Sequence, residues 1–342
     1  MTSRTIFAAA HVVAGPDDCT TLDWDATLAF RHHLWQQGLG VAEAMDTAQR
    51  GMGLDWATAA ELIKRSAADA LAEGGLIACG AGTDQLATVP TGLDEVIAAY
   101  TEQLSVVESA GAQPILMASR QLAEIARDAD DYHEVYGWLL GQLSGKAILH
   151  WLGPMFDPAL AGYWGSEDLD AATETFLSVI EANAGRVDGV KISLLDADRE
   201  IALRRRLPAG VRCYTGDDFN YPRLIAGDEH GHSDALLGVF DPLAVVAKRA
   251  MSALDACDTE GFLAELEPTV PLARHVFEAP TRFYKTGVVF LAWLGGYQDH
   301  FTMLGGLETA RSREHLLRCH ELAAELDLFA DPELAAKRAA LL

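Results

Sequence analysis

Residues 146–152 (KAILHWL) and 188–193 (DGVKIS) are two short apolar runs that frame an amphipathic stretch, residues 168–185. Short runs rich in Val, Ile, Leu and Ala predict buried strands, and a helical pattern between two of them is typical of a βαβ unit with parallel strands. The second run is interrupted by Lys191, where an apolar residue is expected in a buried strand. The segment predicts an α/β fold and singles out one charged side chain.

The same alternation extends over the first 256 residues. Eight apolar runs alternate with eight amphipathic stretches, several of which open on Ser, Thr or Asp as an N-cap. The predicted strands are 5–13, 40–46, 75–80, 113–118, 146–152, 188–193, 211–215 and 234–240. The predicted helices are 23–37, 56–72, 92–110, 121–142, 168–185, 197–206, 218–227 and 242–256. This order favours a closed (β/α)8 TIM barrel over an open doubly wound sheet, and no G-x-G-x-x-G follows the first strand.

After residue 256 the pattern is helical only. The predicted helices here are 258–276, 283–296, 309–325 and 331–342. No linker rich in Gly, Ser or Pro separates them from the preceding residues, so we predict a barrel over 1–256 and a C-terminal helical extension over 257–342 that packs on it. Residues 284–301 are unusually aromatic, which indicates a buried helix or a subunit contact rather than a lid.

Composition argues against several classes of protein. The 342 residues include 50 acidic and 26 basic side chains, a net charge of -24 at pH 7, whereas nucleic-acid-binding proteins need clustered Lys and Arg. No apolar stretch approaches the roughly 18 residues of a membrane span. The five cysteines are odd in number and widely spaced, which indicates a reducing compartment. We therefore expect a cytoplasmic protein without nucleic-acid or membrane partners.

Two residues on the predicted strands are candidates for catalysis. In a TIM barrel the active site gathers at the C-terminal ends of the strands. Lys191 lies in an apolar strand, where burial would lower the pKa of its amine and make it nucleophilic. A lysine paired with a carboxylate at the barrel mouth is the alternative. His150 lies near the end of the preceding strand and titrates near neutrality, which suits proton transfer, although it could instead bond a backbone carbonyl.

Three segments resemble the dihydrodipicolinate synthase and N-acetylneuraminate lyase superfamily, in particular a divergent branch of it. L-I-A-C-G-A-G-T (76–83) is similar to its strand-three segment, D-G-V-K-I-S (188–193) to the segment with its Schiff-base lysine, and Y-T-G-D-D (214–218) to its next strand. The resemblance implies a class I aldolase that needs no cofactor, takes a small carbonyl substrate and forms a dimer or tetramer. It assigns imine formation to Lys191.

The sequence departs from this superfamily at two strands. The family's G-T-T-G-like loop after strand two, which holds a substrate carboxylate, is here Met45-Asp46-Thr47-Ala48-Gln49. An anionic Asp46 repels a pyruvate carboxylate. It would act as a general base or a sugar-hydroxyl acceptor, or merely form an ion pair or cap the next helix. Glu43, three positions earlier, should point to the opposite face of the strand. His150 stands where the family's strand five has its proton-relay tyrosine.

Further polar residues complete the predicted mouth. Arg120 suits a substrate carboxylate or phosphate, but also fits a surface position at the start of a helix. Of the two aspartates that end strand seven, Asp218 is the more natural helix cap. The predicted substrate-binding residues are Asp46, Thr47, Thr83, Arg120, Tyr214, Asp217 and His11.

The sequence therefore predicts a lyase or aldolase that forms a Schiff base with a keto acid or keto sugar through Lys191, assisted by His150 and without a metal. One alternative is a metal-dependent sugar isomerase or epimerase, in which carboxylates and histidines converge on one divalent ion. The residues considered for that ion are Asp46, His150, His230, His232 and Glu43. A second alternative is a non-catalytic barrel that binds a sugar.

Overall fold

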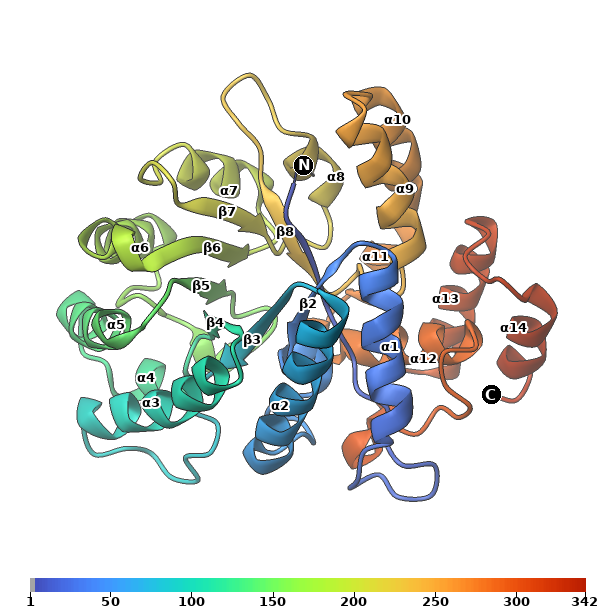
Figure 1. Ribbon diagram of the computed structural model, residues 1–342, viewed down its shortest axis with the longest axis horizontal. Helices are drawn as coiled ribbons and strands as arrows, with labels where there is room; N and C mark the ends of the chain where they lie inside the picture. Colours follow the sequence, from blue (N-terminus) through green and yellow to red (C-terminus); the bar gives the residue numbers. More distant parts are fainter. Residues whose placement is uncertain (1–3) are drawn as a thin grey trace.

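The computed structural model describes residues 4–342, and its strands close into an eight-stranded parallel barrel (Figure 1). Each strand pairs with the next in the chain, and β1 pairs with β8 to close the ring. The strands are β1 (Ile6–Ala9), β2 (Gly40–Glu43), β3 (Ile77–Ala81), β4 (Gln113–Leu116), β5 (Ala147–Leu152), β6 (Val187–Ser193), β7 (Arg212–Thr215) and β8 (Asp234–Leu237). The predicted TIM barrel is confirmed.

Four predicted strands extend too far at their C-terminal ends, among them β4, which ends at Leu116 rather than at residue 118. Beyond Ala9 the chain turns toward α1 (Trp24–Gln36), because Val13 bonds the backbone of Asp23 and the hydroxyl of Thr27 instead of a neighbouring strand. β2 ends at Glu43, since Ala44 has a φ of 53°, outside the range of an extended strand. β8 likewise ends at Leu237 rather than at residue 240.

Helices cover the outside of the barrel. They are α1, α2 (Trp56–Glu73), α3 (Leu93–Ser109), α4 (Arg120–Ile125), α5 (Ala129–Gln142), α6 (Leu169–Ala182), α7 (Ala197–Arg204), α8 (Tyr221–Ala226) and α9 (Ala244–Asp255). The single helix predicted over 121–142 is wrong. The chain is extended at Ala126, and the Asp128 side chain accepts a hydrogen bond from the Asp130 backbone N–H, which starts α5 anew.

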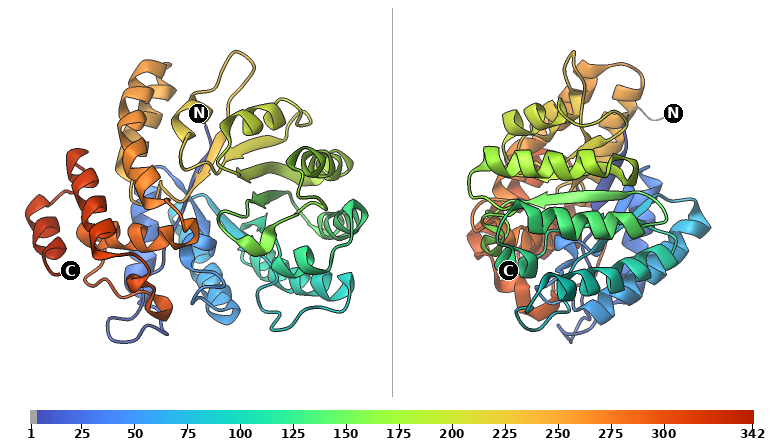
Figure 2. Two further views of the ribbon diagram at one scale, coloured as in Figure 1. Left: turned by 180° about the vertical axis from the view of Figure 1, so that it is seen from behind. Right: turned by 90° about the vertical axis from the view of Figure 1, so that its left-hand side faces the viewer.

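Five more helices form the C-terminal region: α10 (Thr259–Leu266), α11 (Val270–Val276), α12 (Tyr284–Leu294), α13 (Arg313–Glu325) and α14 (Pro332–Ala339). The helix predicted over 258–276 is divided by the 3-10 turn η4 (Glu267–Thr269), because Pro268 and Pro271 lack the N–H that a continuous α-helix needs. The C-terminal region lies on the α1 side of the barrel (Figure 2), where Tyr297, just beyond α12, packs against Phe30 of α1. The domain boundary at residue 256 stays a prediction.

Every residue of α12 is buried, as expected for a buried helix. Its first turn packs against η1 (Asp46–Ala48), the 3-10 turn that follows β2. α12 therefore brings the C-terminal region to the C-terminal end of the barrel, where an active site is expected. None of the described helices is both long and apolar enough to cross a membrane.

Side chains of the strands alternate between two cores. Phe7, Ile148 and Leu236 point into the barrel and pack on one another there. Val41 and Val190 point outward into the larger core between the strands and the helices. Because this alternation has a period of two, the sequence position of any other strand residue tells whether its side chain points into the barrel or toward the helices.

Glu43 faces outward, as its distance from Asp46 predicts. Its carboxylate accepts two hydrogen bonds from the Arg31 guanidinium of α1, at 2.8 and 2.9 Å, and one from the Ser66 hydroxyl of α2 at 2.6 Å. Although burial opposes its ionisation, Arg31 and the other donors hold the pKa of Glu43 below its ordinary value. Glu43 thus binds the two helices to β2 and lies outside the barrel.

Candidate active site

A cavity of about 260 Å³ lies among the loops that follow β2, β3, β4 and β5. Four predicted site residues line it, namely Asp46, Thr83, Arg120 and His150. Each lies at or beyond the C-terminal half of its own strand, so the closed parallel barrel brings them to one end. The structure thus brings these four residues together at one cavity, while their roles in binding and catalysis stay predictions.

Two of these side chains are held by neighbours on the loops. The Thr83 hydroxyl bonds Ser119 Oγ at 2.6 Å and donates to Gln121 Oε1 at 2.7 Å. The Nε of Arg120 donates to the Asp157 carboxylate. The Arg120 side chain is 43% exposed, so its guanidinium is at the rim of the cavity and accessible to an anion.

Lys191 lies inside the barrel, next to the cavity wall. Its neighbours Val190 and Ile192 belong to the outer core, so the strand alternation turns Lys191 inward. Its register partners are His150 of β5 and Tyr214 of β7. The residue is 8% exposed. Burial lowers the pKa of the Lys191 amine, while the negative charges of Asp218 and Asp46 act in the opposite direction.

The Lys191 amine makes no close ion pair with the described residues. Within residues 4–342, no carboxylate lies within 4.0 Å of it and no hydrogen bond holds it. Two carboxylates influence its charge from farther away. A carbonyl carbon can therefore approach the nitrogen without first displacing a bonded partner.

His150 is the nearest base to Lys191 along the sheet. It is 2% exposed, and its Nε2 lies 3.1 Å from Ser193 Oγ on β6. Burial, and then the charge of Lys191, lowers the pKa of His150 well below its ordinary value. The imidazole is consequently neutral at pH 7 and able to accept a proton.

The two aspartates after β7 have different surroundings. Asp217 accepts hydrogen bonds from the backbone N–H groups of Phe219 and Asn220, in the turn just before α8, and its substrate contact stays a prediction. Asp218 acts on the charge of Lys191 and accepts a hydrogen bond from the Val239 N–H at 2.9 Å. Burial raises the pKa of Asp218 to about 7, although Lys191 acts to lower it.

Gly216 makes room for this cluster. A Cβ atom here would overlap Ser193 Oγ and would lie 2.8 Å from the Ile192 carbonyl oxygen and 2.9 Å from Lys191 Cε. Real Cβ contacts are not this short, and the backbone carbonyl cannot move aside easily. The glycine of Y-T-G-D-D is therefore required by the lysine and serine of the neighbouring strand.

We expect Gly216→Ala to displace Lys191 and to lower stability by about 1–3 kcal/mol, the usual cost of overpacking. Thermal unfolding and borohydride trapping of a carbonyl adduct on Lys191 measure the two effects. Gly145→Ala is the matched control, because a Cβ at this position would meet no described atom within 4 Å. A Gly216→Ala protein with unchanged stability and trapping would show that the site tolerates the methyl group.

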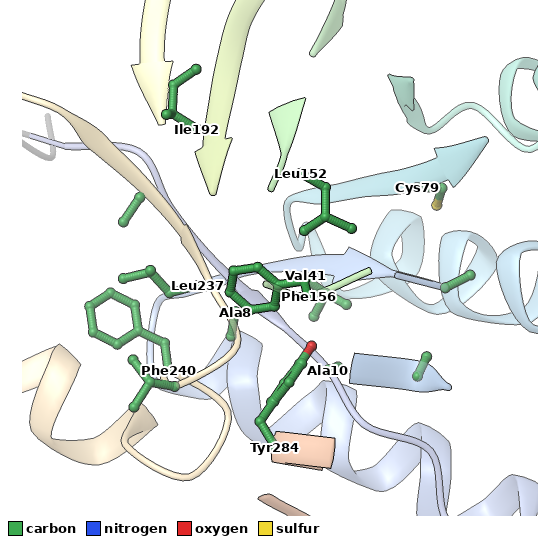
Figure 3. Close-up of a cluster of buried hydrophobic side chains, with 14 of the residues drawn as sticks. Ala8, Ala10, Val41, Cys79, Leu152, Phe156, Ile192, Leu237, Phe240 and Tyr284 are labelled. Carbon is green, nitrogen blue, oxygen red and sulfur yellow. The ribbon is translucent and has the colours of Figure 1, made fainter. Parts of the chain in front are cut away.

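The C-terminal region contributes two side chains that the sequence did not point to. The Tyr284 hydroxyl bonds Thr47 Oγ1 at 2.7 Å, and its ring stacks on Phe277 at 4.3 Å. In Figure 3 the Tyr284 side chain extends from α12 toward Phe156. Burial, and then the charge of Asp46, raises the pKa of Tyr284 well above its ordinary value, so this phenol keeps its proton at neutral pH.

Lys285 is a second buried amine near the mouth. It is 2% exposed, and its Nζ donates to the Met52 sulfur at 3.3 Å. Burial lowers the pKa of Lys285, whereas the charge of Asp46 acts to raise it. The charge of Asp46 thus acts on both Lys191 and Lys285. Its contact with substrate stays a prediction.

His11 and Tyr214, both predicted to bind substrate, do not line the cavity. His11 is fully buried, with Nδ1 2.8 Å from Asp241 Oδ2 and Nε2 3.1 Å from Gln298 Oε1. Tyr214 points into the barrel, but its hydroxyl donates to Asp188 at the start of β6, toward the opposite end. Both side chains already have internal partners, so their binding roles have no support in the geometry.

The residues considered for a divalent ion are not brought together. Glu43 is outside the barrel, as described above. His230 and His232 lie in the loop before β8, beside Arg212 at the N-terminal end of β7. In the described part of the chain, no group of three or more potential ligands includes Asp46 or His150. The geometry gives no support to the predicted metal alternative.

Some of the missed residues had a signal in the sequence and others had none. Ser193 follows Lys191 by two positions in β6, so strand alternation places it on the inner face. Asp218 lies in the turn beyond β7, where alternation gives no direction. Tyr284 lies more than 90 residues beyond Lys191 in a helical region. No local pattern joins it to the barrel mouth.

Comparison with known proteins gives a family and a fold. The sequence model of a family described as "Protein of unknown function (DUF993)" matches residues 1–342. No curated protein sequence matches the chain.

Solved structures are similar at low sequence identity. They include dihydrodipicolinate synthase from Aquifex aeolicus (13% identity, TM-score 0.74, 96% of this chain and 100% of that one). The chloride-inhibited synthase from Acinetobacter baumannii complexed with pyruvate has 14% identity and a TM-score of 0.73 over 96% and 100% of the two chains. YagE of E. coli K12, a prophage protein of the same family in complex with pyruvate, has 13% identity and a TM-score of 0.72 over 95% and 99%. At this identity the likeness establishes the fold alone.

Proposed function

The chain belongs to the family described as Protein of unknown function (DUF993), and we propose that it is a class I aldolase-type lyase that forms a Schiff base through Lys191. The observation that carries the proposal is the buried amine of Lys191, unpaired within residues 4–342 and held inside the barrel beside neutral His150. The fold that it shares with dihydrodipicolinate synthases supports this reaction class by analogy.

The proposed reaction begins with attack of the neutral Lys191 amine on a substrate carbonyl carbon. The C–N bond forms as the carbonyl π electrons move to oxygen, which takes a proton, and the resulting carbinolamine loses water to give a protonated imine. Asp218 suits the proton donor, because its pKa of about 7 leaves it partly protonated at neutral pH.

Bond cleavage then uses the imine as an electron sink. A base removes the proton of the β-hydroxyl, the carbon–carbon bond breaks, and its electron pair moves through the new double bond to the imine nitrogen. His150 is neutral and buried next to Lys191, so we assign it this base role. Elimination of water in place of the carbon–carbon cleavage would need the same groups. The reaction as proposed requires no cofactor.

Asp46 favours a keto sugar over a 2-keto acid as substrate. Its carboxylate at the cavity wall acts on the charges of both Lys191 and Lys285. A carboxylate repels the carboxylate of a 2-keto acid and accepts hydrogen bonds from sugar hydroxyls. Arg120 at the rim then fits an anionic group farther along the substrate, such as a phosphate or a terminal carboxylate.

Borohydride trapping tests the proposal. We expect incubation with sodium borohydride and a keto sugar, with dihydroxyacetone and pyruvate as further probes, to leave a reduced adduct on Lys191 that peptide mass spectrometry locates. Both rival functions, the metal-dependent isomerase and the non-catalytic sugar-binding barrel, predict an unmodified Lys191. Trapping on Lys285 alone would refute the assignment of the nucleophile.

The proposal also includes a cytoplasmic homo-oligomer, either a dimer or a tetramer. All five cysteines of the chain are free, which suits a reducing compartment. Light scattering coupled to size-exclusion chromatography measures the oligomeric state directly.

A further inference from the structure

We propose that His275, His315 and Cys319 form a zinc site in the C-terminal helical region, independent of the catalytic cavity. One ligand atom of each residue lies within 4.8 Å of the other two. His275 lies on α11, while His315 and Cys319 lie on α13. None of the three residues lines the cavity at the barrel mouth.

The helices hold these side chains in fixed positions. His315 and Cys319 are four residues apart on α13, so both project from the same face of the helix. The His275 ring stacks on the His315 ring with centroids 4.2 Å apart, and one His275 nitrogen, Nε2, lies 3.0 Å from the His315 carbonyl oxygen. The site thus links α11 to α13 through residues that are already close together.

The hydrogen bonding of His315 leaves a ligand atom free. Its Nδ1 lies 2.9 Å from Glu278 Oε1, an arrangement in which Nδ1 donates its proton to the carboxylate. Nε2 then carries a lone pair, yet it is buried without a hydrogen-bond partner among the described residues. His315 is 7% exposed. A buried nitrogen without a partner is unfavourable, and a bound cation relieves that cost.

Glu278 is the outer partner that such a site requires. Metal-binding histidines usually donate their other ring N–H to a carboxylate, which fixes the tautomer and orients the ring. Glu278 contacts the two histidines differently: its second oxygen lies 3.5 Å from His275 Nδ1, which is the nitrogen of His275 left for the metal because Nε2 donates to the His315 carbonyl oxygen. The Glu278 carboxylate also offsets the positive charge that a divalent ion brings to a half-buried position.

The ligand set selects the ion. Two imidazoles and one thiol match Zn²⁺, which accepts nitrogen and sulfur ligands and takes four-coordinate geometry, with water or Glu278 as the fourth ligand. Binding replaces the thiol proton of Cys319, which is released to solvent as the sulfur–zinc bond forms. Cys319 Sγ also packs against α12, where a Cβ on Gly287 would lie 3.7 Å from it. The ion therefore joins the helices that support Tyr284 and Lys285.

The test measures metal bound by the full chain. After treatment with a chelator and titration with Zn²⁺, we expect about one zinc per chain by mass spectrometry, as a three-ligand site requires. Co²⁺ in place of zinc should give thiolate-to-cobalt charge-transfer absorption. Cys319→Ser should abolish that absorption, and His315→Ala should weaken zinc binding at least about tenfold.

Matched variants keep the result interpretable if a site variant fails to fold. Cys257→Ser changes an exposed free cysteine. His320→Ala changes the residue next to Cys319, and the His320 ring stacks on Phe329 instead of facing the site. Both controls should keep full zinc and cobalt binding. Wild-type protein that takes up no stoichiometric zinc, or cobalt spectra unchanged in Cys319→Ser, would overturn the proposal. Neither result affects the Lys191 assignment, because borohydride trapping needs no metal.

Discussion

Lys191→Met is expected to abolish turnover and borohydride trapping while leaving the protein folded. Methionine has a similar length but no amine, so no imine can form, and loss of a covalent nucleophile lowers kcat by about 10⁴-fold or more. The buried amine has no hydrogen bond or ion pair in the described residues, so its replacement leaves no orphaned partner. A less polar side chain in the barrel should keep or raise the unfolding temperature.

Two other lysines provide the comparison for this variant. Lys248 lies on the outside, where its Nζ donates to the Gln36 carbonyl oxygen, so Lys248→Met should trap adduct as wild type does. Lys285→Met removes the other buried amine and should leave the modified peptide unchanged, namely the one that contains Lys191. If the adduct persisted in Lys191→Met and disappeared in Lys285→Met, the nucleophile would be Lys285 on α12 rather than Lys191.

The second large effect is expected for Asp218→Asn. If Asp218 delivers a proton to the carbinolamine oxygen, its amide replacement should slow imine formation by about 10²- to 10³-fold. Burial raises the pKa of Asp218 to about 7, so wild-type protein holds it protonated below pH 7 and ionised above. The wild-type trapping rate should therefore fall as pH rises through about 7, and that decline should be missing in Asp218→Asn.

Asp218→Asn should also shift the titration of Lys191. The negative charge of Asp218 acts to raise the pKa of the amine, so its removal lowers that pKa and increases the free amine at any given pH. Asp217→Asn is the matched control, because Asp217 is equally buried but bonds the start of α8. It should retain a decline with pH, shifted to lower pH, because the charge of Asp217 also helps to raise the pKa of Asp218. A control that loses the decline altogether would refute the proton-donor role of Asp218.

The barrel could be predicted because its evidence is local. The apolar runs around Val41 and Val190 and the amphipathic stretches between them follow directly from burial on both faces of a parallel sheet. The errors occurred at element ends. One predicted strand ended early because the backbone turns at Ala44, and two predicted helices were divided at Asp128 and Pro268. Propensity summed over a stretch of residues does not locate a single cap or turn.

The candidate site could be predicted only in part. Strand-end position was sufficient to place His150, Asp46, Thr83 and Arg120 at one cavity and Lys191 inside the barrel, while their roles stay predictions. It did not give the internal partners of Tyr214 and Asp217, because strand-end position gives neither the direction of a hydroxyl nor the N–H groups that a carboxylate meets. Asp218 lies in the turn beyond β7, so strand alternation did not give its direction.

By itself the sequence determined the parallel barrel, the inward-facing lysine of β6 and the polar residues at the strand ends, because these depend on periodicities of two and 3.6 residues along the chain. Only the tertiary structure decided that Tyr284 bonds Thr47, that Asp218 acts on Lys191 and that His275 meets Cys319. Those contacts join residues far apart in the chain. They depend on how the closed barrel and the C-terminal helices pack, which no local pattern encodes.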